Sequence, residues 1–517
     1  MVDVTSFIAD HYFFYLVLLF SVLGNLTVHF VLKRKSRSQE SIFCMAVKLV
    51  LTVVSDLCIS VCFSSVASGL DGRAIMCAAA FSAGTLLYLT VRFLNNMTKS
   101  LVKRTKKINA VGIGTFLYFL FYLLVFRQSK ICYWGSLWYA ADYSLGLGSR
   151  FFIGSFLRLF SGRFLDNQTA VVFCYVFLVI LIVLLSIAGN NMYSVCKDNY
   201  RLAFLYIWVM FLVSPGSVVC YWYSENMFGR LEMYGLVIGV GCLLLYKKLG
   251  MNKITFTLIT ILSVLSIAIY QGNVFMYYPL IMMIFIWEIM NNFKSLSKWL
   301  YGLINFAATS LTFLYFQFGS RINFDNAEQM ANYIGRNTNI PICFDALDYE
   351  FFKPRAQIYT ELNIEYYNDT LPRESTIVTI IVLVPLIIMF IGLYAKCIKS
   401  YKSRHLNKSI LSSVYVYFLS LLVIIIPQFV LNVDWGRWMV SEMVLLFMGF
   451  LFLLWMKDEG AIEAGSALSN WINRHRFVSI LVLAYVAGLN KFDHYVFIEQ
   501  VRNIMQWLID HGLVFNQ

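Results

Sequence analysis

Residues 170 to 189 read "AVVFCYVFLVILIVLLSIAG", twenty residues without a charged side chain. A helix of this composition suits the hydrocarbon core of a bilayer, which roughly 20 mostly apolar residues can cross. Similar runs recur along the chain of 517 residues, of which 60% are hydrophobic and only 13% are charged. Because these runs are continuous and do not alternate between apolar and polar residues, they predict membrane-spanning helices and not the strands of a barrel.

The sequence therefore predicts an all-α, polytopic integral membrane bundle. Fourteen stretches are apolar and long enough to cross a bilayer. Their expected bounds are 11–32, 41–65, 74–95, 108–127, 170–189, 202–220, 230–247, 254–271, 274–291, 299–318, 376–395, 409–431, 438–456 and 476–490.

Lysine and arginine indicate which connections face the cytoplasm, because basic residues are retained on that side during insertion. Alternate connections between the predicted spans hold 24 of the 41 basic residues and 5 of the 28 acidic residues. This alternation predicts that both termini face outward. It also accounts for most of the net charge of +13, so we expect no nucleic-acid partner.

Four regions are expected along the chain. A basic joint, "KSLVKRTKK", ends an accessory three-helix bundle at residue 107. The soluble-looking connection after residue 318 contains "NAEQMANYIGRN", which predicts a helix capped by Asn326. The expected regions are the accessory bundle 1–107, a core membrane domain 108–318 with an outer loop and an interfacial helix, an extracytoplasmic loop subdomain 319–375, and C-terminal membrane helices with a second interfacial helix, 376–517.

Polar residues gather at four hairpin mouths, all on the predicted outer side. Charges at a membrane boundary are costly, so they are candidates for function. Carboxylates can take a proton from a hydroxyl, arginine matches phosphate oxygens with two hydrogen bonds, and aromatic rings stack on sugars. The four stretches are 139–164, 214–234, 270–279 and 433–438.

These stretches supply the candidate site residues. Asp142, Glu225 and Asp434 are the predicted catalytic residues. The alternative without a binding site is that Trp and Tyr only form the aromatic belt of the membrane interface. Asp434 would then pair with Arg437, its i+3 neighbour on a helix. The predicted substrate-binding residues are Arg150, Arg230, Glu232, Gln271, Tyr277, Tyr278 and Arg437.

The segment from Arg150 to Phe164 alternates phenylalanine and leucine with arginine. It is too short and too basic to span a bilayer, and it suits a helix lying in the headgroup plane. Such a helix would hold a lipid phosphate near Asp142.

This layout resembles that of the polytopic glycosyltransferases of the GT-C type, which use a polyprenyl-phosphate-linked sugar at the outer face of the membrane. The resemblance lies in an outer loop with an acid, an interfacial helix, and many later spans. It implies that Asp142 is the base that activates an acceptor hydroxyl and that Arg150, Arg230 or Arg437 holds the donor phosphate. The implied partners are membrane lipids, the polyprenyl-phosphate-linked sugar, and a glycan or lipid acceptor in cell-surface glycan assembly at the cell membrane.

Three alternatives remain open. An O-antigen-type polymerase or ligase would share the outer arginines. A transporter or flippase would need ionisable groups or broken helices near the bilayer midplane and paired repeats, whereas Asp56 and Glu288 are almost the only charges inside the predicted spans and no internal repeat is found. A sensor or scaffold would have outer charges that form self-contained pairs. No histidine spacing predicts a zinc site, and no cofactor is required, although Asp142 and Glu225 offer ligands to a divalent cation.

Overall fold

The computed structural model describes residues 109–126, 128–162, 164–214, 217–353, 370–405, 413–424 and 435–488. The chain divides into two compact units, and the second unit, Asn109–Leu159 with Leu178–Gln517, contains all the sites considered below. The predicted spans 11–32, 41–65 and 74–95, the predicted C-terminal interfacial helix and Asp434 lie outside the described residues.

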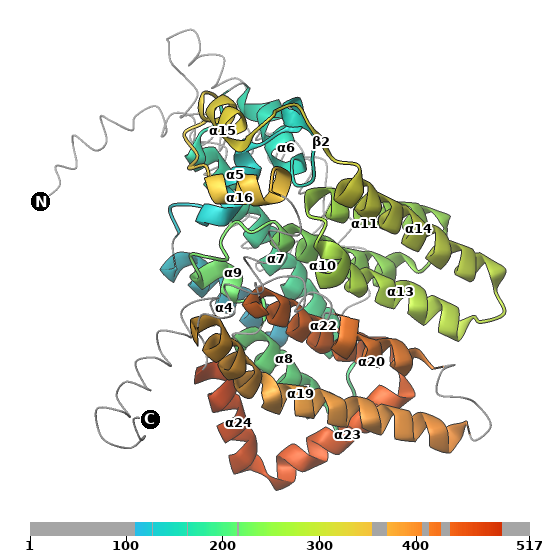
Figure 1. Cartoon of the computed structure of the whole chain (residues 1–517). Helices are drawn as coiled ribbons and strands as arrows, with labels where there is room; N and C mark the ends of the chain where they lie inside the picture. The colour runs from blue at the N-terminus through green and yellow to red at the C-terminus, as the bar shows by residue number, and fades with distance from the viewer. Residues whose placement is uncertain are drawn as a thin grey trace, which may run out of the picture. The chain divides into compact units, whose positions relative to one another are not determined.

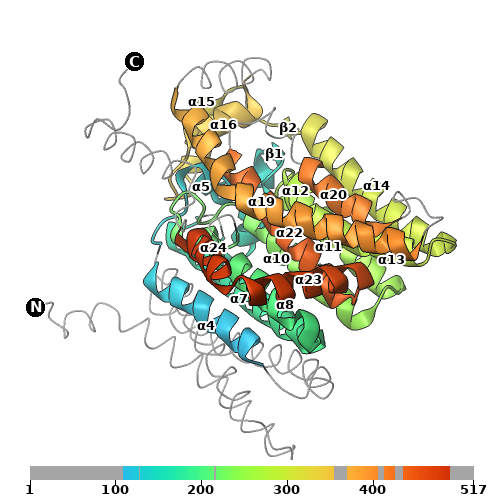
Figure 2. The same ribbon diagram turned by 90° about the horizontal axis from the view of Figure 1, so that it is seen from below.

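The described residues are mostly helical (Figures 1 and 2). Their one sheet pairs two short antiparallel strands, β1 (Gly146–Leu147) and β2 (Arg321–Ile322). The α-helices are α4 (Ala110–Val125), α5 (Tyr133–Ala140), α6 (Phe152–Ser161), α7 (Asn167–Val195), α8 (Asp198–Val213), α9 (Cys220–Tyr223), α10 (Glu232–Leu249), α11 (Lys253–Ile269), α12 (Asn273–Met276), α13 (Tyr278–Asn291), α14 (Leu296–Phe318), α15 (Ala327–Gly335), α16 (Phe344–Phe351), α19 (Thr370–Arg404), α20 (Val414–Ile424), α22 (Trp435–Trp455), α23 (Glu459–Arg474) and α24 (Arg476–Gly488), with a 3-10 helix at Tyr143–Leu145.

Four of the described helices are long and apolar enough to cross a membrane. They are Asn167–Val195, Leu296–Phe318, and the stretches Leu383–Arg404 of α19 and Arg437–Trp455 of α22. The structure is thus mostly helical and has helices that could cross a membrane, as the prediction of a helical membrane protein requires. The count of fourteen spans and their orientation remain predictions.

Helix α22 is the most enclosed of these four. The structure buries 94% of its apolar stretch, against 22% to 39% for the other three. It packs against α8, α13, α19 and α20. Phe447 illustrates the packing, since its ring lies 5.7 Å from that of Phe211 on α8 and 4.9 Å from that of Phe390 on α19. The core of the described membrane part is therefore built around α22.

Several boundaries differ from the sequence-based expectation, and two of these differences have a local explanation. The predicted span 274–291 is divided into α12 and α13 at Tyr277, and Pro279 lies in the first turn of α13, where its missing N–H costs nothing. The predicted connection 457–476 forms helix α23, because Asp458 accepts a hydrogen bond from the Ala461 N–H at 2.8 Å and caps the first turn.

The connection after α14 folds back on the segment that contains α5. Strand β2 pairs with β1, and the Ser136 hydroxyl donates to the Pro341 carbonyl at 2.5 Å. The Phe351 ring lies 6.0 Å from that of Trp138 and 5.3 Å from that of Phe151. The predicted helix capped by Asn326 is confirmed as α15, where the Asn326 side chain accepts from the Gln329 N–H. This packing places α16 beside α5.

Candidate functional site

Polar side chains from all four hairpin stretches, together with Glu350 of α16, meet in the second unit. We call them the Arg150–Arg437 cluster. They come from the segment before α6, the start of α10, the turn between α11 and α12, helix α16 and the start of α22. The members are Ser149, Arg150, Glu232, Tyr270, Gln271, Glu350 and Arg437.

A buried ion pair forms one half of the cluster. The Nε–H of Arg437 donates to Oε1 of Glu232 at 2.8 Å, and the two side chains are only 7% and 1% exposed. Glu232 is the first residue of α10, where a negative charge also favours the positive end of the helix dipole. A second N–H of Arg437 donates to the Tyr270 hydroxyl at 3.2 Å. Arg437 is thus fixed by an acid and a phenol.

A second arginine forms the other half. Arg150 pairs with Glu350 at 3.0 Å. The other oxygen of Glu350 accepts from the Gln271 amide and from the Ser149 hydroxyl, each at 3.2 Å. The Arg150 guanidinium also lies over the Trp138 ring, 4.7 Å from its centroid. Aromatic stacking of this kind is favoured by the planar, weakly hydrated guanidinium.

Tyr270 joins the two halves. Its ring lies 5.0 Å from the Arg150 guanidinium while its hydroxyl accepts from Arg437. Two guanidinium groups therefore meet at one tyrosine, and each is neutralised by a carboxylate, Glu350 or Glu232. An anionic ligand at this place would have to compete with a carboxylate for its arginine.

The backbone at Arg150 is strained. Its φ of 70° lies in the left-handed region, which residues with a Cβ rarely adopt. Such conformations persist where the surrounding structure enforces them, and they concentrate at functional sites. Here the contacts of the side chain with Trp138, Tyr270 and Glu350 hold the residue in place.

Asp142 is held by α6. One carboxylate oxygen accepts from the Ser144 N–H at 2.7 Å, and the other forms an ion pair with Arg158, which also donates to the Ala140 carbonyl at 3.0 Å. Helix α6 approaches closely because Gly154 lies against the Ala141 carbonyl, where a Cβ would clash. The predicted helix after Arg150 is thus present, and Arg158 is engaged by the predicted base.

Tyr277 and Tyr278 are buried at the start of α13. The Tyr277 hydroxyl lies 2.8 Å from that of Tyr221, and the Tyr278 hydroxyl donates to the Asn305 side chain at 2.9 Å. Both hydroxyl groups therefore connect packed helices. Their role in substrate binding stays a prediction.

Arg230 lies near the cluster and Glu225 does not join it. Burial raises the pKa of the Cys132 thiol, and the Arg230 guanidinium opposes that shift. The charges of Glu232 and Arg437 act on the same thiol, so Arg230 lies near this part of the cluster. Arg230 also donates to the Asn226 carbonyl at 2.9 Å. Glu225 is exposed, and no contact among the described residues links it to the cluster.

Four residues of interest were not predicted as site residues. Ser149, Tyr270 and Glu350 complete the cluster, and Glu442 is a buried acid within α22. A signal for Glu442 was available, because a lone acid in the apolar run "VSEMVLLF" is costly in a membrane helix. Glu350 follows two other acids, Asp345 and Asp348, in α16, and nothing in its sequence neighbourhood distinguishes it.

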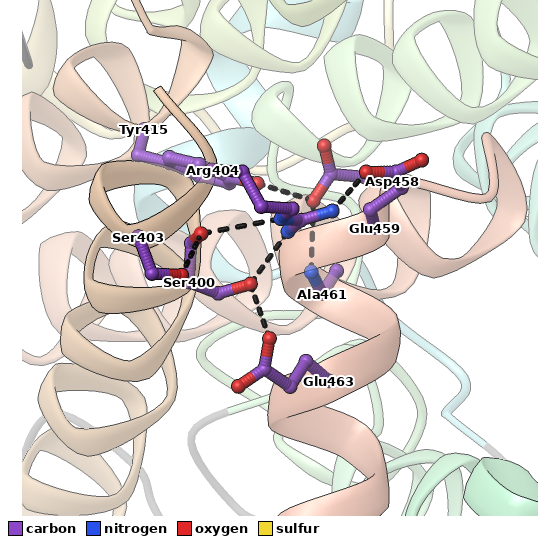
Figure 3. A network of polar contacts seen from close by, with 8 residues as sticks. All are labelled: Ser400, Ser403, Arg404, Tyr415, Asp458, Glu459, Ala461 and Glu463. Carbon is purple, nitrogen blue, oxygen red and sulfur yellow. Dashed lines mark hydrogen bonds and ion pairs between the residues drawn. The ribbon is translucent and has the colours of Figure 1, made fainter. Parts of the chain in front are cut away.

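A second polar cluster lies at the far end of α19, where α20 and α23 meet it (Figure 3). We call it the Arg404 cluster. Arg404 pairs with Glu459 and donates to the Ser400 hydroxyl at 2.5 Å. The Ser400 hydroxyl in turn donates to Glu463 at 2.5 Å. The full set is Ser400, Ser403, Arg404, Tyr415, Asp458, Glu459 and Glu463.

The groups of the Arg404 cluster satisfy one another. The Tyr415 hydroxyl donates to the same Asp458 carboxylate oxygen that caps α23. Burial raises the pKa of Asp458, whereas the Ser400 hydroxyl lowers that of Glu463. This arrangement ties three helices together, and we regard it as a structural clamp.

Among the residues that the structure describes, no group of three or more His, Cys, Asp or Glu could hold a metal ion. Comparison of the chain with models of protein families, with curated proteins and with solved structures finds no match. The candidate site must therefore be interpreted from its own geometry.

Proposed function

We propose that the protein is a polytopic membrane glycosyltransferase that moves a sugar from a polyprenyl-phosphate carrier to a glycan or lipid acceptor. The observation that carries this proposal is the meeting of Arg150 and Arg437 at Tyr270. Two guanidinium groups beside an aromatic ring suit a phosphate next to a sugar. Each guanidinium can donate two hydrogen bonds to phosphate oxygens, and the ring can stack on the sugar.

In this proposal the chain has fourteen spans, both termini face outward, and the Arg150–Arg437 cluster lies on the outer face of the cell membrane. The starts of α10 and α22 and the turn after α11 would all face that side. The segment from β2 to α16 would then be an extracytoplasmic subdomain that supplies Glu350.

Four residues, Asp142, Arg150, Arg437 and Glu350, have a proposed role in the transfer. Asp142 accepts the proton of the acceptor hydroxyl, whose oxygen attacks the anomeric carbon of the donor sugar. The bond from that carbon to the phosphate oxygen breaks, and polyprenyl phosphate leaves with its charge held by Arg150 and Arg437. Arg150 is paired with Glu350, so a donor phosphate that binds Arg150 would compete with this carboxylate.

A transporter is the second candidate, and Glu442 favours it. An acid buried within a helix long enough to cross a membrane is expected along a transport path. A scaffold without activity is the third, because the described arginines of the cluster are each paired with a carboxylate.

The test is an activity assay on the full chain in lipid nanodiscs with polyprenyl-phosphate-linked sugars and a glycan acceptor. Asp142→Asn keeps the hydrogen bond from Ser144 and removes the base, which should lower turnover by about two to four powers of ten. Arg150→Lys and Arg437→Lys keep the charge and lose the paired hydrogen bonds, so donor binding should weaken.

Arg336→Ala is the matched control, since Arg336 is an exposed arginine just after α15. It should transfer sugar at the wild-type rate. Sugar transfer by Asp142→Asn equal to that of the wild-type protein would remove Asp142 as the base. No release of polyprenyl phosphate by a folded wild-type protein with any donor would favour transport or a scaffold.

A further inference from the structure

Glu442 differs from the other buried charged residues in the described part of the chain. Four charged residues in this part of the chain are less than a tenth exposed: Asp142, Glu232, Arg437 and Glu442. Asp142 pairs with Arg158, and Glu232 pairs with Arg437. Glu442 is 4% exposed, and neither of its carboxylate oxygens has a hydrogen-bond partner among the described residues.

The surroundings of Glu442 do not favour a permanent charge. It lies in the apolar stretch Arg437–Trp455 of α22, the most enclosed of the four long apolar helices. Burying an ionised carboxylate without a partner is so costly that such a group normally takes up a proton. Glu442 should therefore be neutral in the state that the structure represents.

Helices packed against α22 offer Glu442 no described charge partner. One turn along α22, Tyr394 of α19 donates to the Leu446 carbonyl at 3.3 Å. The basic groups Lys399 and Lys402 follow Tyr394 in the last turns of α19, beyond that level, and Arg474 is the last residue of α23. Helix α19 also carries the buried thiol Cys397, and Tyr401, whose ring contacts those of His405 and Tyr415. The remaining described titratable groups on α8, α13, α19, α20 and α23 are each bonded elsewhere. They are Asp198, Tyr200, Arg201, Tyr206, Tyr278, Glu288, Lys396, Arg404, Tyr415, Tyr417, Glu459 and Glu463.

One donor does lie close by on α22 itself. Trp438 is four residues before Glu442, so the two side chains are neighbours on one face of the helix. The Glu442 side chain also leans toward the N-terminal end of α22, and so toward Trp438. Trp438 is 3% exposed, and its indole N–H has no hydrogen-bond acceptor among the described residues.

We propose that Glu442 is a proton-binding site inside the membrane part of α22, with the Trp438 indole N–H as the donor to its ionised form. The carboxylic acid is the form favoured by the apolar surroundings. After the proton passes to water, the ionised carboxylate can accept a hydrogen bond from the indole N–H of Trp438. The inference goes beyond sugar transfer and does not depend on it.

Infrared difference spectroscopy of the full-length protein in lipid nanodiscs tests this directly. The carbonyl stretch of a protonated carboxyl group is recorded while the pH rises from about 5 to about 10, across and beyond the usual range of carboxyl groups. The wild-type protein should show a carbonyl band that is lost as the pH rises. Glu442→Gln should lack that band, and Trp438→Phe should shift its midpoint to higher pH.

Glu288→Gln is the matched control, because Glu288 is held by Tyr246 at 2.6 Å and by Lys298 at 2.7 Å. It should retain the titrating band. Identical spectra of the wild-type protein and Glu442→Gln would overturn the proposal, as would a Glu442 band that never titrates. An unchanged midpoint in Trp438→Phe would remove the role of the indole.

A second measurement needs no variant. Dicyclohexylcarbodiimide enters membranes and reacts with a protonated carboxyl group. The carboxyl O–H adds across one C=N bond of the reagent, and the acyl group then migrates from oxygen to nitrogen. No group leaves, so the adduct has the summed mass of both. Peptide mass spectrometry should find the adduct on Glu442 at neutral pH and less of it as the pH rises. Absence of labelling on Glu442 at every pH, in protein that is folded, would contradict a protonated carboxyl there.

Discussion

Arg437 donates its Nε–H to Glu232 across 2.8 Å, although 205 residues separate the two in the sequence. The contact joins the first turn of α22 to the first residue of α10. Because both side chains are nearly inaccessible to water, neither charge can be solvated if its partner is removed. The pair therefore links the folding of two distant helices.

Removal of one member of this pair should destabilise the protein strongly. Glu232→Ala removes the described carboxylate partner of Arg437, and Arg437→Ala leaves the Glu232 carboxylate buried without its arginine; such a loss typically costs about 3 to 5 kcal/mol. The double replacement Glu232→Met with Arg437→Met should cost less than either single change, because it leaves no charge behind. Thermal unfolding in detergent, followed by tryptophan fluorescence, gives the order of stabilities.

The exposed pair Asp198–Arg201 is the control for this experiment. Its side chains are 90% and 42% exposed, and such pairs contribute about 1 kcal/mol or less. Asp198→Ala should barely change the midpoint. A double methionine variant less stable than both single alanine variants would contradict the buried-charge explanation.

The strain at Arg150 can be measured with two replacements that remove the same side chain. Arg150→Ala keeps a Cβ at a φ of 70°, whereas Arg150→Gly does not. Relief of a left-handed conformation is worth about 1 to 2 kcal/mol per residue, so the glycine variant should unfold at the higher temperature. Equal midpoints would mean that the backbone relaxes once the guanidinium contacts are lost.

The predictable part of the fold follows from long apolar runs. The composition of α7, α14, α19 and α22 is sufficient to predict membrane helices, and the charge of Glu232 at a helix start marks it as unusual. These features depend on residues adjacent in the sequence. Local hydropathy determines them.

The remainder depends on tertiary contacts. No local pattern selects Glu350 as the partner of Arg150, since the pairing follows from the packing of α16 on α5. The division of the span at Tyr277 arises where its hydroxyl meets Tyr221 of α9. Glu442 was overlooked for a different reason, because one acid in a long apolar run barely changes its mean hydropathy.

Close packing at Gly460 should make the Arg404 cluster sensitive to a single methyl group. A Cβ at Gly460 would clash first with the Tyr415 hydroxyl, which Figure 3 shows above the start of α23, and would lie 3.1 Å from the Cys397 carbonyl. Gly460→Ala should therefore lower the unfolding temperature, by a change in free energy of about 1 to 3 kcal/mol.

Tyr415→Phe removes the nearest atom and should offset part of that loss. The double variant is expected to be more stable than the sum of the two single effects predicts, because the residues are in direct contact. If the effects of the two single variants add strictly, the loss caused by Gly460→Ala arises from the contact with the Cys397 carbonyl and not from Tyr415.

Two carboxylates of the Arg404 cluster should respond to pH in opposite directions. Burial raises the pKa of Asp458 above its ordinary value of 3.8, so its contribution is full below that value and is lost as the pH rises through the folded-state pKa. The hydrogen bond from Ser400 lowers the pKa of Glu463 below 4.5, so its contribution exists above 4.5 and is lost as the pH falls.

Unfolding temperatures between about pH 3 and pH 7 measure both effects. Asp458→Asn keeps an acceptor for the Ala461 N–H and should gain stability relative to the wild-type protein as the pH rises. Glu463→Gln should lose stability relative to the wild-type protein over the same range. Asp458→Ala, which also removes the cap, should cost a further 1 kcal/mol or so. Parallel pH profiles for Asp458→Asn and the wild-type protein would contradict the raised pKa.

Enclosure of α22 has a consequence for biogenesis. The ribosome makes this helix after α8, α13, α19 and α20, yet they surround it in the finished protein. Those helices must leave a gap toward the lipid or the insertion machinery until α22 emerges, and the gap closes only when α22 enters it. Maturation of the bundle should therefore wait for a late segment of the nascent chain, and shortened chains that end before α22 should be recognised by quality-control proteases.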